Sequence, residues 1–184
     1  MGRCKQLLPL RGKPAIRHCL ESLLRGGATQ VLVVLGAYGE QIATAAKGPG
    51  VTLLSNRDRA GDMASSIRAG IAALPPAAPA ALICLSDMPL VAPQTIAALL
   101  AAHRRTHGSI ILPRHGNRRG HPVLIPREIL KDLDAQMTLR DLMHRHAQQT
   151  ETVDMADPGT TLDMDTPADY DRLRALCETE PSAG

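Results

Sequence analysis

The chain has 184 residues, of which 44% are hydrophobic and only 1% aromatic, and its formal charge is +3. This length suits one well-buried domain, whose core must be aliphatic because Phe and Trp are absent. The small charge and the scarcity of rings exclude the basic, aromatic-rich surface of a typical nucleic-acid binder. No apolar run approaches the roughly 20 residues of a membrane span, so we expect neither nucleic acid nor membrane as a partner.

The cysteines indicate a reduced environment. Cys4, Cys19, Cys84 and Cys177 form no C-x-x-C pair and have no histidine beside them at metal-ligand spacing. Cys19 and Cys84 lie within apolar runs and are predicted to be small buried residues. Because no secretory signal is visible either, we expect a cytoplasmic protein.

Helix and strand signals alternate along the first half of the chain. A helix is predicted for 15–24, where Ile16, Leu20 and Leu23 share one face, with Pro14 in its first turn. The apolar run 31–35 predicts a strand that is buried on both faces. Further strands are predicted at 51–54 and 81–85, and further helices at 39–46 and 63–74.

The same alternation continues in the second half. The last helix, predicted for 167–177, has a clear start signal, because Thr166 can cap it and Asp169 completes a capping-box variant. Alternating strands and helices favour a mostly parallel sheet covered on both faces, in a single domain over 1–184 with a frayed tail at 179–184. The other predicted elements are helices at 93–106, 127–133 and 138–146 and strands at 109–112, 123–125 and 152–155.

Carboxylates stand at two places suited to binding a metal. Asp87 follows the predicted strand 81–85, and ligands of open α/β sheets bind at the carboxyl ends of strands. Asp163 and Asp165 precede the last helix, and residues two apart in an extended segment face the same way. Each position also suits an ordinary loop, as a turn aspartate or a solvated pre-helical acid. Together they supply the carboxylates that a nucleotide-bound Mg²⁺ requires.

Other polar segments could contact anionic substrates. Lys5, in GRCKQLLPLRGKP, is either a surface lysine or a group that neutralises a leaving pyrophosphate. Gly61, Ser65 and Ser66 lie near a helix start, where they either bind a nucleotide or simply cap the helix.

The loop PRHGNRRGHP concentrates basic side chains. It is either a solvated loop or a binding site for the phosphate of a second substrate. Its members are Arg114, His115, Arg118, Arg119 and His121.

Five segments together resemble the MobA-like nucleotidyltransferases, and most closely their molybdenum cofactor cytidylyltransferase branch. In chain order they are GRCKQLLPLRGKP, GDMASSIRAG, LSDMPLV, RRGHPVLIP and LDMDTPADY. The resemblance implies a three-layer α/β/α Rossmann-like sandwich of the nucleotide-diphospho-sugar transferase type. It also implies Mg²⁺-dependent transfer of CMP from CTP, which is favoured over GMP from GTP, to the terminal phosphate of molybdopterin, with release of pyrophosphate.

The resemblance assigns a role to each matching residue. Lys5 would contact the triphosphate, Asp87 and Asp165 would be catalytic metal ligands, and Asp163 would be an auxiliary acid at the metal. The nucleotide would lie beside Gly61, Ser65 and Ser66, and the second substrate beside Gly120 and His121.

Two departures from the family pattern are visible. Family members begin with a strand and a loop of the form LAAGxSxRMG, whereas this chain begins with MGRCK. We therefore expect that a central strand is missing, and that the start lies upstream or the chain is impaired. At 134–141 a GDxGxR-like stretch is replaced by DAQMTLRD. The alternatives are transfer to another acceptor, such as a sugar phosphate, and a non-catalytic protein that delivers cofactor to a molybdoenzyme.

Overall fold

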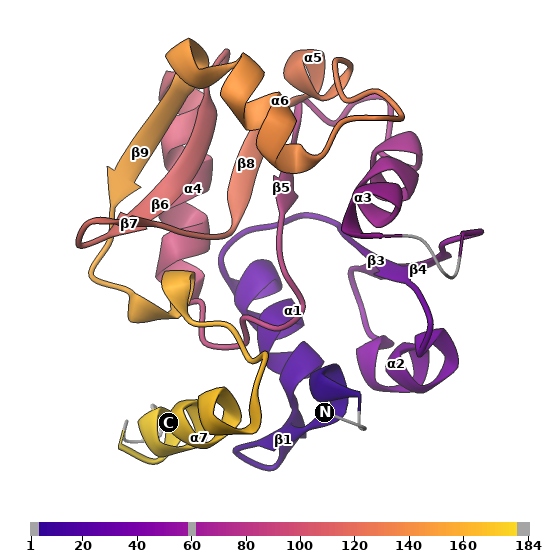
Figure 1. Ribbon diagram of the computed structural model, residues 1–184, viewed down its shortest axis with the longest axis vertical. Helices are drawn as coiled ribbons and strands as arrows, with labels where there is room; N and C mark the ends of the chain where they lie inside the picture. The colour runs from indigo at the N-terminus through magenta and orange to yellow at the C-terminus, as the bar shows by residue number, and fades with distance from the viewer. Residues whose placement is uncertain (1–3, 59–61, 180–184) are drawn as a thin grey trace.

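The computed structural model describes residues 4–58 and 62–179, and in it strands form a central layer between helices (Figure 1). The strands are β1 (Pro9–Leu10), β2 (Lys13–Pro14), β3 (Val31–Leu35), β4 (Val51–Ser55), β5 (Ala80–Ile83), β6 (Ile110–His115), β7 (Arg118–Arg119), β8 (Val123–Pro126) and β9 (Thr150–Asp154). The α-helices are α1 (Ala15–Arg25), α2 (Gly39–Ala46), α3 (Met63–Ala72), α4 (Pro93–Arg105), α5 (Arg127–Leu130), α6 (Leu139–Arg145) and α7 (Pro167–Thr179). Short 3-10 helices are η1 (Lys5–Leu7), η2 (Ala147–Gln149) and η3 (Pro158–Thr161).

The central strands pair in mixed directions. β3 and β4 are parallel, and so are β6 and β9. β8 is antiparallel to both β5 and β6 in a sheet of order β5–β8–β6–β7. The reason is the short connection from β6 to β8 through the turn at Gly116, because parallel neighbours need a long crossover. The structure confirms the predicted α/β class and shows a sheet of mixed direction.

Helices cover both faces of the strand layer. Side chains of successive strand residues point to opposite faces. On β5, Leu82 packs with residues of α1 and α4, whereas Ala81 and Ile83 pack in the cluster that contains Ile67 and Ile71 of α3. α2 shares the α1 side, and α5 and α6 share the α3 side. The predicted three-layer α/β/α sandwich is therefore present.

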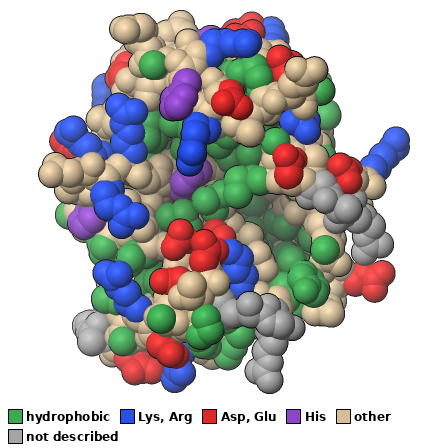
Figure 2. All heavy atoms as spheres, in the orientation of Figure 1, with side chains coloured by type: hydrophobic (Ala, Val, Ile, Leu, Met, Phe, Trp, Pro, Cys, Tyr) green, Lys and Arg blue, Asp and Glu red, His purple; other side chains and the backbone are tan. Residues whose placement is uncertain are grey.

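The strand layer is interrupted between β3 and β5. Val33 of β3 packs with α1 and Val34 with Gly70 of α3, so β3 lies between the same two helices as β5. Among the described residues, however, no backbone pairing joins these strands, and they belong to separate sheets. All residues of β5 are only half-buried, and hydrophobic side chains lie open near the middle of the face in Figure 2. The prediction that 31–35 is buried on both faces is thus wrong for its middle residues, because one edge of β3 has no neighbouring strand among residues 4–58 and 62–179.

The β1–β2 hairpin and α7 lie at the same end of the molecule (Figure 1). Leu10 of the β1–β2 hairpin and Ala15 of α1 form a buried cluster with Met164, Leu173 and Cys177. This packing holds α7 and the segment before it against the N-terminal hairpin. This packing brings Lys5 close to Asp165.

Most predicted elements lie where the sequence placed them. α2 has the predicted bounds, α1 ends one residue beyond its predicted end, and Thr166 and Asp169 form the predicted cap of α7. The prediction for Pro14 is wrong, since it ends the β1–β2 hairpin and precedes α1. Of the tail predicted to fray, 179–184, the first residue is the last of α7, and 180–184 lie outside the described residues.

Two further expectations can be compared with the structure. Cys19 is buried and Cys84 half-buried, and neither forms a disulfide within the described residues. In the described part of the chain, the helices are all too short or too polar to cross a membrane.

Candidate functional site

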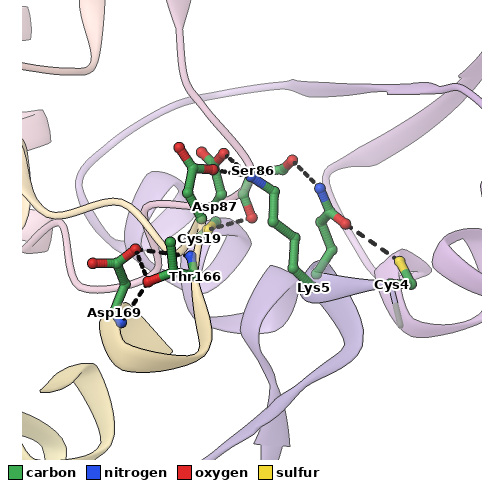
Figure 3. Close-up of polar contacts among 9 residues, drawn as sticks. Cys4, Lys5, Cys19, Ser86, Asp87, Thr166 and Asp169 are labelled. Carbon is green, nitrogen blue, oxygen red and sulfur yellow. Dashed lines mark hydrogen bonds and ion pairs between the residues drawn. The ribbon is translucent and has the colours of Figure 1, made fainter. Parts of the chain in front are cut away.

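Lys5 joins two aspartates from distant parts of the chain. Its Nζ donates hydrogen bonds of 2.6 Å to Oδ2 of Asp87 and of 2.6 Å to Oδ1 of Asp165. Figure 3 shows the Lys5 side chain reaching from the N-terminal segment to Asp87 in the loop after β5. Each of these residues is a predicted site residue, and the fold brings all three into one cluster, the Lys5–Asp87–Asp165 cluster.

Backbone and side-chain contacts fix each member of this cluster. Lys5 begins η1, whose next residue, Gln6, donates from Nε2 to Oγ of Ser86 at 3.2 Å. Asp87 follows Ser86 at the carboxyl end of β5. Asp165 precedes the Thr166 cap of α7 (Figure 3). Two helix ends and a strand end therefore meet at this point.

The charges in the cluster are only partly screened by water. The Lys5 side chain is 27% exposed and that of Asp87 19%, whereas Asp165 is 61% exposed. Burial alone would lower the pKa of Lys5, but its hydrogen bonds to Asp165 and Asp87 outweigh that effect and raise the pKa above its usual value. Lys5 is thus held as an ammonium between two carboxylates.

One oxygen of Asp87 and one nitrogen of His121 are buried without a hydrogen-bond partner in the described part of the chain. Oδ1 of Asp87 and Nδ1 of His121 accept or donate no hydrogen bond within the described residues. Burial lowers the pKa of His121, while the Ile83 backbone and the charge of Asp87 act in the opposite direction. Buried polar atoms are normally satisfied, so these two mark a place suited to a polar ligand.

Asp163 lies near the cluster but makes no contact within it that the structure records. Met164 is fully buried, and Asp163 and Asp165 on either side of it are exposed, as expected for an alternating extended segment. In the described residues, no three His, Cys, Asp or Glu side chains form a metal site by themselves. Asp87 and Asp165 fit Mg²⁺, which commonly binds one or two carboxylates and completes its shell with water and substrate phosphates.

The serines predicted to contact the nucleotide form a second polar group at the end of β4. The buried Asn56 donates from Nδ2 to Oγ of Ser65 at 3.0 Å and to Oγ of Ser66 at 3.2 Å. Asp62 caps α3 by accepting from the backbone N–H of Ser65. The predicted Gly61 lies outside the described residues. Asn56 is a site candidate that sequence reasoning missed, since an Asn in NRDR carries no signal beyond that of a loop.

Gly120 and His121 lie against η3. The His121 N–H donates to the Thr160 carbonyl at 2.9 Å, and a Cβ on Gly120 would overlap that same carbonyl. Gly120 therefore has a packing reason for being glycine. η3 itself is anchored by Asp157, whose carboxylate accepts from the Ala92 N–H and from the Thr95 hydroxyl.

The predicted basic loop is mostly at the surface. Arg114 forms a two-point ion pair with Asp154, at 2.6 Å and 2.9 Å, and both side chains are exposed. His115 is held by the Met155 carbonyl, and Arg118 and Arg119 are exposed on β7. The charge of Asp87 acts to raise the pKa of His121, which links this end of the loop to the cluster.

Comparison with known proteins identifies the family. A family model described as the MobA-like NTP transferase domain matches residues 1–152. The chain belongs to this family. The order of motifs along the chain had indicated the same family, and the domain is that of a nucleotidyltransferase.

Individual relatives cover nearly the whole chain. Nicotine blue oxidoreductase of Paenarthrobacter nicotinovorans is 29% identical over 179 residues, which are 92% of this chain and 87% of the relative. Rv0371c of Mycobacterium tuberculosis, in a complex with manganese, is 27% identical with a TM-score of 0.75, covering 95% of this chain and 93% of that one. A nucleotidyl transferase of Methanothermobacter thermautotroptrophicus has a TM-score of 0.81 at 22% identity, covering 95% and 85%, and supports the fold.

Proposed function

We propose that the chain transfers a nucleoside monophosphate, CMP in preference to GMP, from a nucleoside triphosphate to the terminal phosphate of a molybdopterin-type acceptor. The observation that carries this proposal is the Lys5–Asp87–Asp165 cluster at the carboxyl end of β5. Two carboxylates and a lysine are what a metal-bound triphosphate requires, and the chain belongs to a family of NTP transferases. The preference for CTP is supported by the motifs shared with the cytidylyltransferase branch.

Asp87 and Asp165 would hold a divalent cation, Mg²⁺ in our proposal, with Asp163 as an auxiliary acid. Bound there, the cation supplies positive charge and a fixed orientation for the phosphates. The unpartnered, buried Oδ1 of Asp87 supports this role because it has spare acceptor capacity. The manganese complex of the 27%-identical Rv0371c supports a divalent cation in this fold.

The reaction needs alignment more than covalent help from the protein. A phosphate oxygen of the acceptor forms a bond to the α-phosphorus, the bond from that phosphorus to the bridging oxygen breaks, and pyrophosphate leaves with the electron pair. Lys5 would screen the charge that develops on the pyrophosphate. The Asn56–Ser65–Ser66 group and Gly61 would orient the nucleotide, and Gly120 and His121 would border the acceptor.

The decisive experiment measures pyrophosphate release with Mg²⁺ or Mn²⁺, with CTP and GTP in parallel, and with molybdopterin or a sugar phosphate as the acceptor. We expect release with CTP and molybdopterin that falls at least about a hundredfold in Asp87→Asn. Asp132→Asn, an exposed aspartate paired with His146, is the matched control and should retain activity. Pyrophosphate release with a sugar phosphate but not with molybdopterin would show that the acceptor is a sugar phosphate. Binding of molybdopterin without pyrophosphate release from any triphosphate would favour a non-catalytic protein that delivers cofactor to a molybdoenzyme.

The relative named nicotine blue oxidoreductase favours a second candidate function, because its identity extends over 92% of this chain. Under this alternative the chain would act as an oxidoreductase on nicotine blue. The test is to follow NADH or NADPH oxidation with nicotine blue as the acceptor. Turnover that survives Asp87→Asn, without pyrophosphate release from CTP or GTP, would establish the oxidoreductase in place of the transferase.

A further inference from the structure

The Lys5 ammonium occupies the position between Asp87 and Asp165 that a metal ion would need. It donates to both carboxylates at 2.6 Å, and the two aspartates come from the β5 loop and the segment before α7. We propose, on the basis of the proposed function, that Lys5 is a resident cation that a divalent metal must displace from this carboxylate pair. The metal and the triphosphate then bind cooperatively.

The exchange follows from distances and charge. Mg²⁺ binds carboxylate oxygens at about 2.0–2.1 Å, and an ammonium that contacts the same two oxygens leaves no room for it. Two cations at such separations also repel each other strongly, because Coulomb energy rises as the distance falls. A metal that bridges Asp87 and Asp165 therefore cannot coexist with Lys5 in its observed place.

Lys5 has the means to leave. Its four-carbon stem is flexible, and its side chain is 27% exposed, so the ammonium can swing without unfolding η1. It then needs a new anionic partner to offset the loss of two ion pairs. The triphosphate is such a partner, whereas a metal that arrives alone brings none.

Asp87 has an oxygen that remains available to a metal. Its Oδ2 contacts Lys5, but its buried Oδ1 has no partner in the described residues. The carboxylate is therefore only partly satisfied while Lys5 holds it. A divalent metal could bind both oxygens of Asp87, the free Oδ1 and the Oδ2 that Lys5 gives up, and so satisfy the carboxylate better than the ammonium does.

The first test measures binding of Mn²⁺ alone, without nucleotide, by the loss of the free-ion signal in electron paramagnetic resonance. We expect Lys5→Met and Lys5→Gln to bind Mn²⁺ about tenfold more tightly than the wild type, which is the scale of two part-exposed ion pairs. Lys13→Met is the matched control, because Lys13 pairs with Glu21 away from the cluster. Adding Asp87→Asn to Lys5→Met should remove the gain.

The second test measures the linkage between metal and nucleotide. In the wild type, Mn²⁺ should raise the affinity for a non-hydrolysable CTP analogue by a larger factor than in Lys5→Met, because only the wild type must release Lys5. Circular dichroism melts confirm that each variant is folded before binding is compared.

The outcomes separate this inference from the proposed function. Equal or weaker Mn²⁺ binding by both Lys5 variants would overturn the resident-cation proposal, even if the wild type transfers nucleotide. Tighter binding by both variants, with the gain lost on Asp87→Asn, would support it even if the acceptor proved not to be molybdopterin. If no variant binds Mn²⁺ and no pyrophosphate is released, both the resident-cation proposal and the proposed transferase function are wrong.

Discussion

The hydroxyl of Tyr170 on α7 donates a hydrogen bond of 2.6 Å to the backbone carbonyl of Pro9 on β1. These residues are 161 positions apart, and their contact lies beside the buried cluster of Leu10, Met164 and Leu173. Together, the hydrogen bond and the cluster keep the segment before α7 beside η1. The distance between Asp165 and Lys5 thus depends on contacts that take no part in chemistry.

Removing this hydroxyl should loosen the docking of α7. We expect Tyr170→Phe to lower the free energy of unfolding by about 1 kcal/mol, the usual net contribution of one hydrogen bond. The matched control is Tyr38→Phe at the chain's other tyrosine, which is 51% exposed and should change stability little. Urea unfolding of the two variants makes the comparison, and equal effects would show that the Tyr170–Pro9 bond does not hold α7.

Gly120 should not tolerate a side chain. A Cβ at this position would overlap the Thr160 carbonyl oxygen, which belongs to the backbone of η3 and has little freedom to move. We expect Gly120→Ala to cost about 2 kcal/mol of stability. Gly108→Ala is the control, because a Cβ there would meet open space at an ordinary backbone angle. A thermal melt of Gly120→Ala that matches Gly108→Ala would contradict the close approach.

Asp157 should be a stabilising residue, although sequence reasoning gave it no role. Its carboxylate accepts hydrogen bonds from the Ala92 N–H, the Thr95 hydroxyl and the Gly159 N–H, and so ties η3 to the start of α4. We expect Asp157→Asn to lower the free energy of unfolding by about 1–3 kcal/mol. Asp154→Asn, at an exposed ion pair that water screens, should lower the stability much less. Guanidinium unfolding curves measure both, and a larger loss in Asp154→Asn would refute this ranking.

Stability should fall in mild acid because of His103. Burial, and then the neighbouring His107, lower the pKa of His103 in the folded protein. Below about pH 6.5 the unfolded chain takes up a proton at this histidine that the folded chain still refuses, so stability decreases as the pH falls. His103→Gln should flatten the acid side of a stability–pH profile. His107→Gln should reduce the loss in part, and a profile identical to wild type in both variants would exclude His103 as its source.

Local sequence signals predicted the elements well and their pairing poorly. The apolar run 31–35 and the Thr166–Asp169 cap are encoded within a few residues, and both are present in the structure. The direction of β8 is not encoded in its own apolar residues, because a short apolar run has the same pattern in a parallel strand as in an antiparallel one. Its antiparallel pairing results from the short turn after β6, which the sequence analysis treated only as a basic loop.

The members of the candidate site could be singled out from their positions in the sequence, but their contact with one another could not. A lysine in a loop and two aspartates before different helices carry no local signal that they meet, and their contact depends on the packing of α7 against the β1–β2 hairpin. Asn56 and Asp157 were missed because their importance lies in burial and in hydrogen bonds to distant residues.

The interruption between β3 and β5 affects the mechanics of the molecule. A sheet that is continuous in hydrogen bonds resists shear between its strands, whereas here the resistance comes from side chains of α1 and α3 packed across both parts. The Asn56–Ser65 group moves with β4, and Asp87 moves with β5. The spacing between the two polar groups is therefore set by helix packing, and it is more compliant than the spacing between neighbouring strands of one ladder.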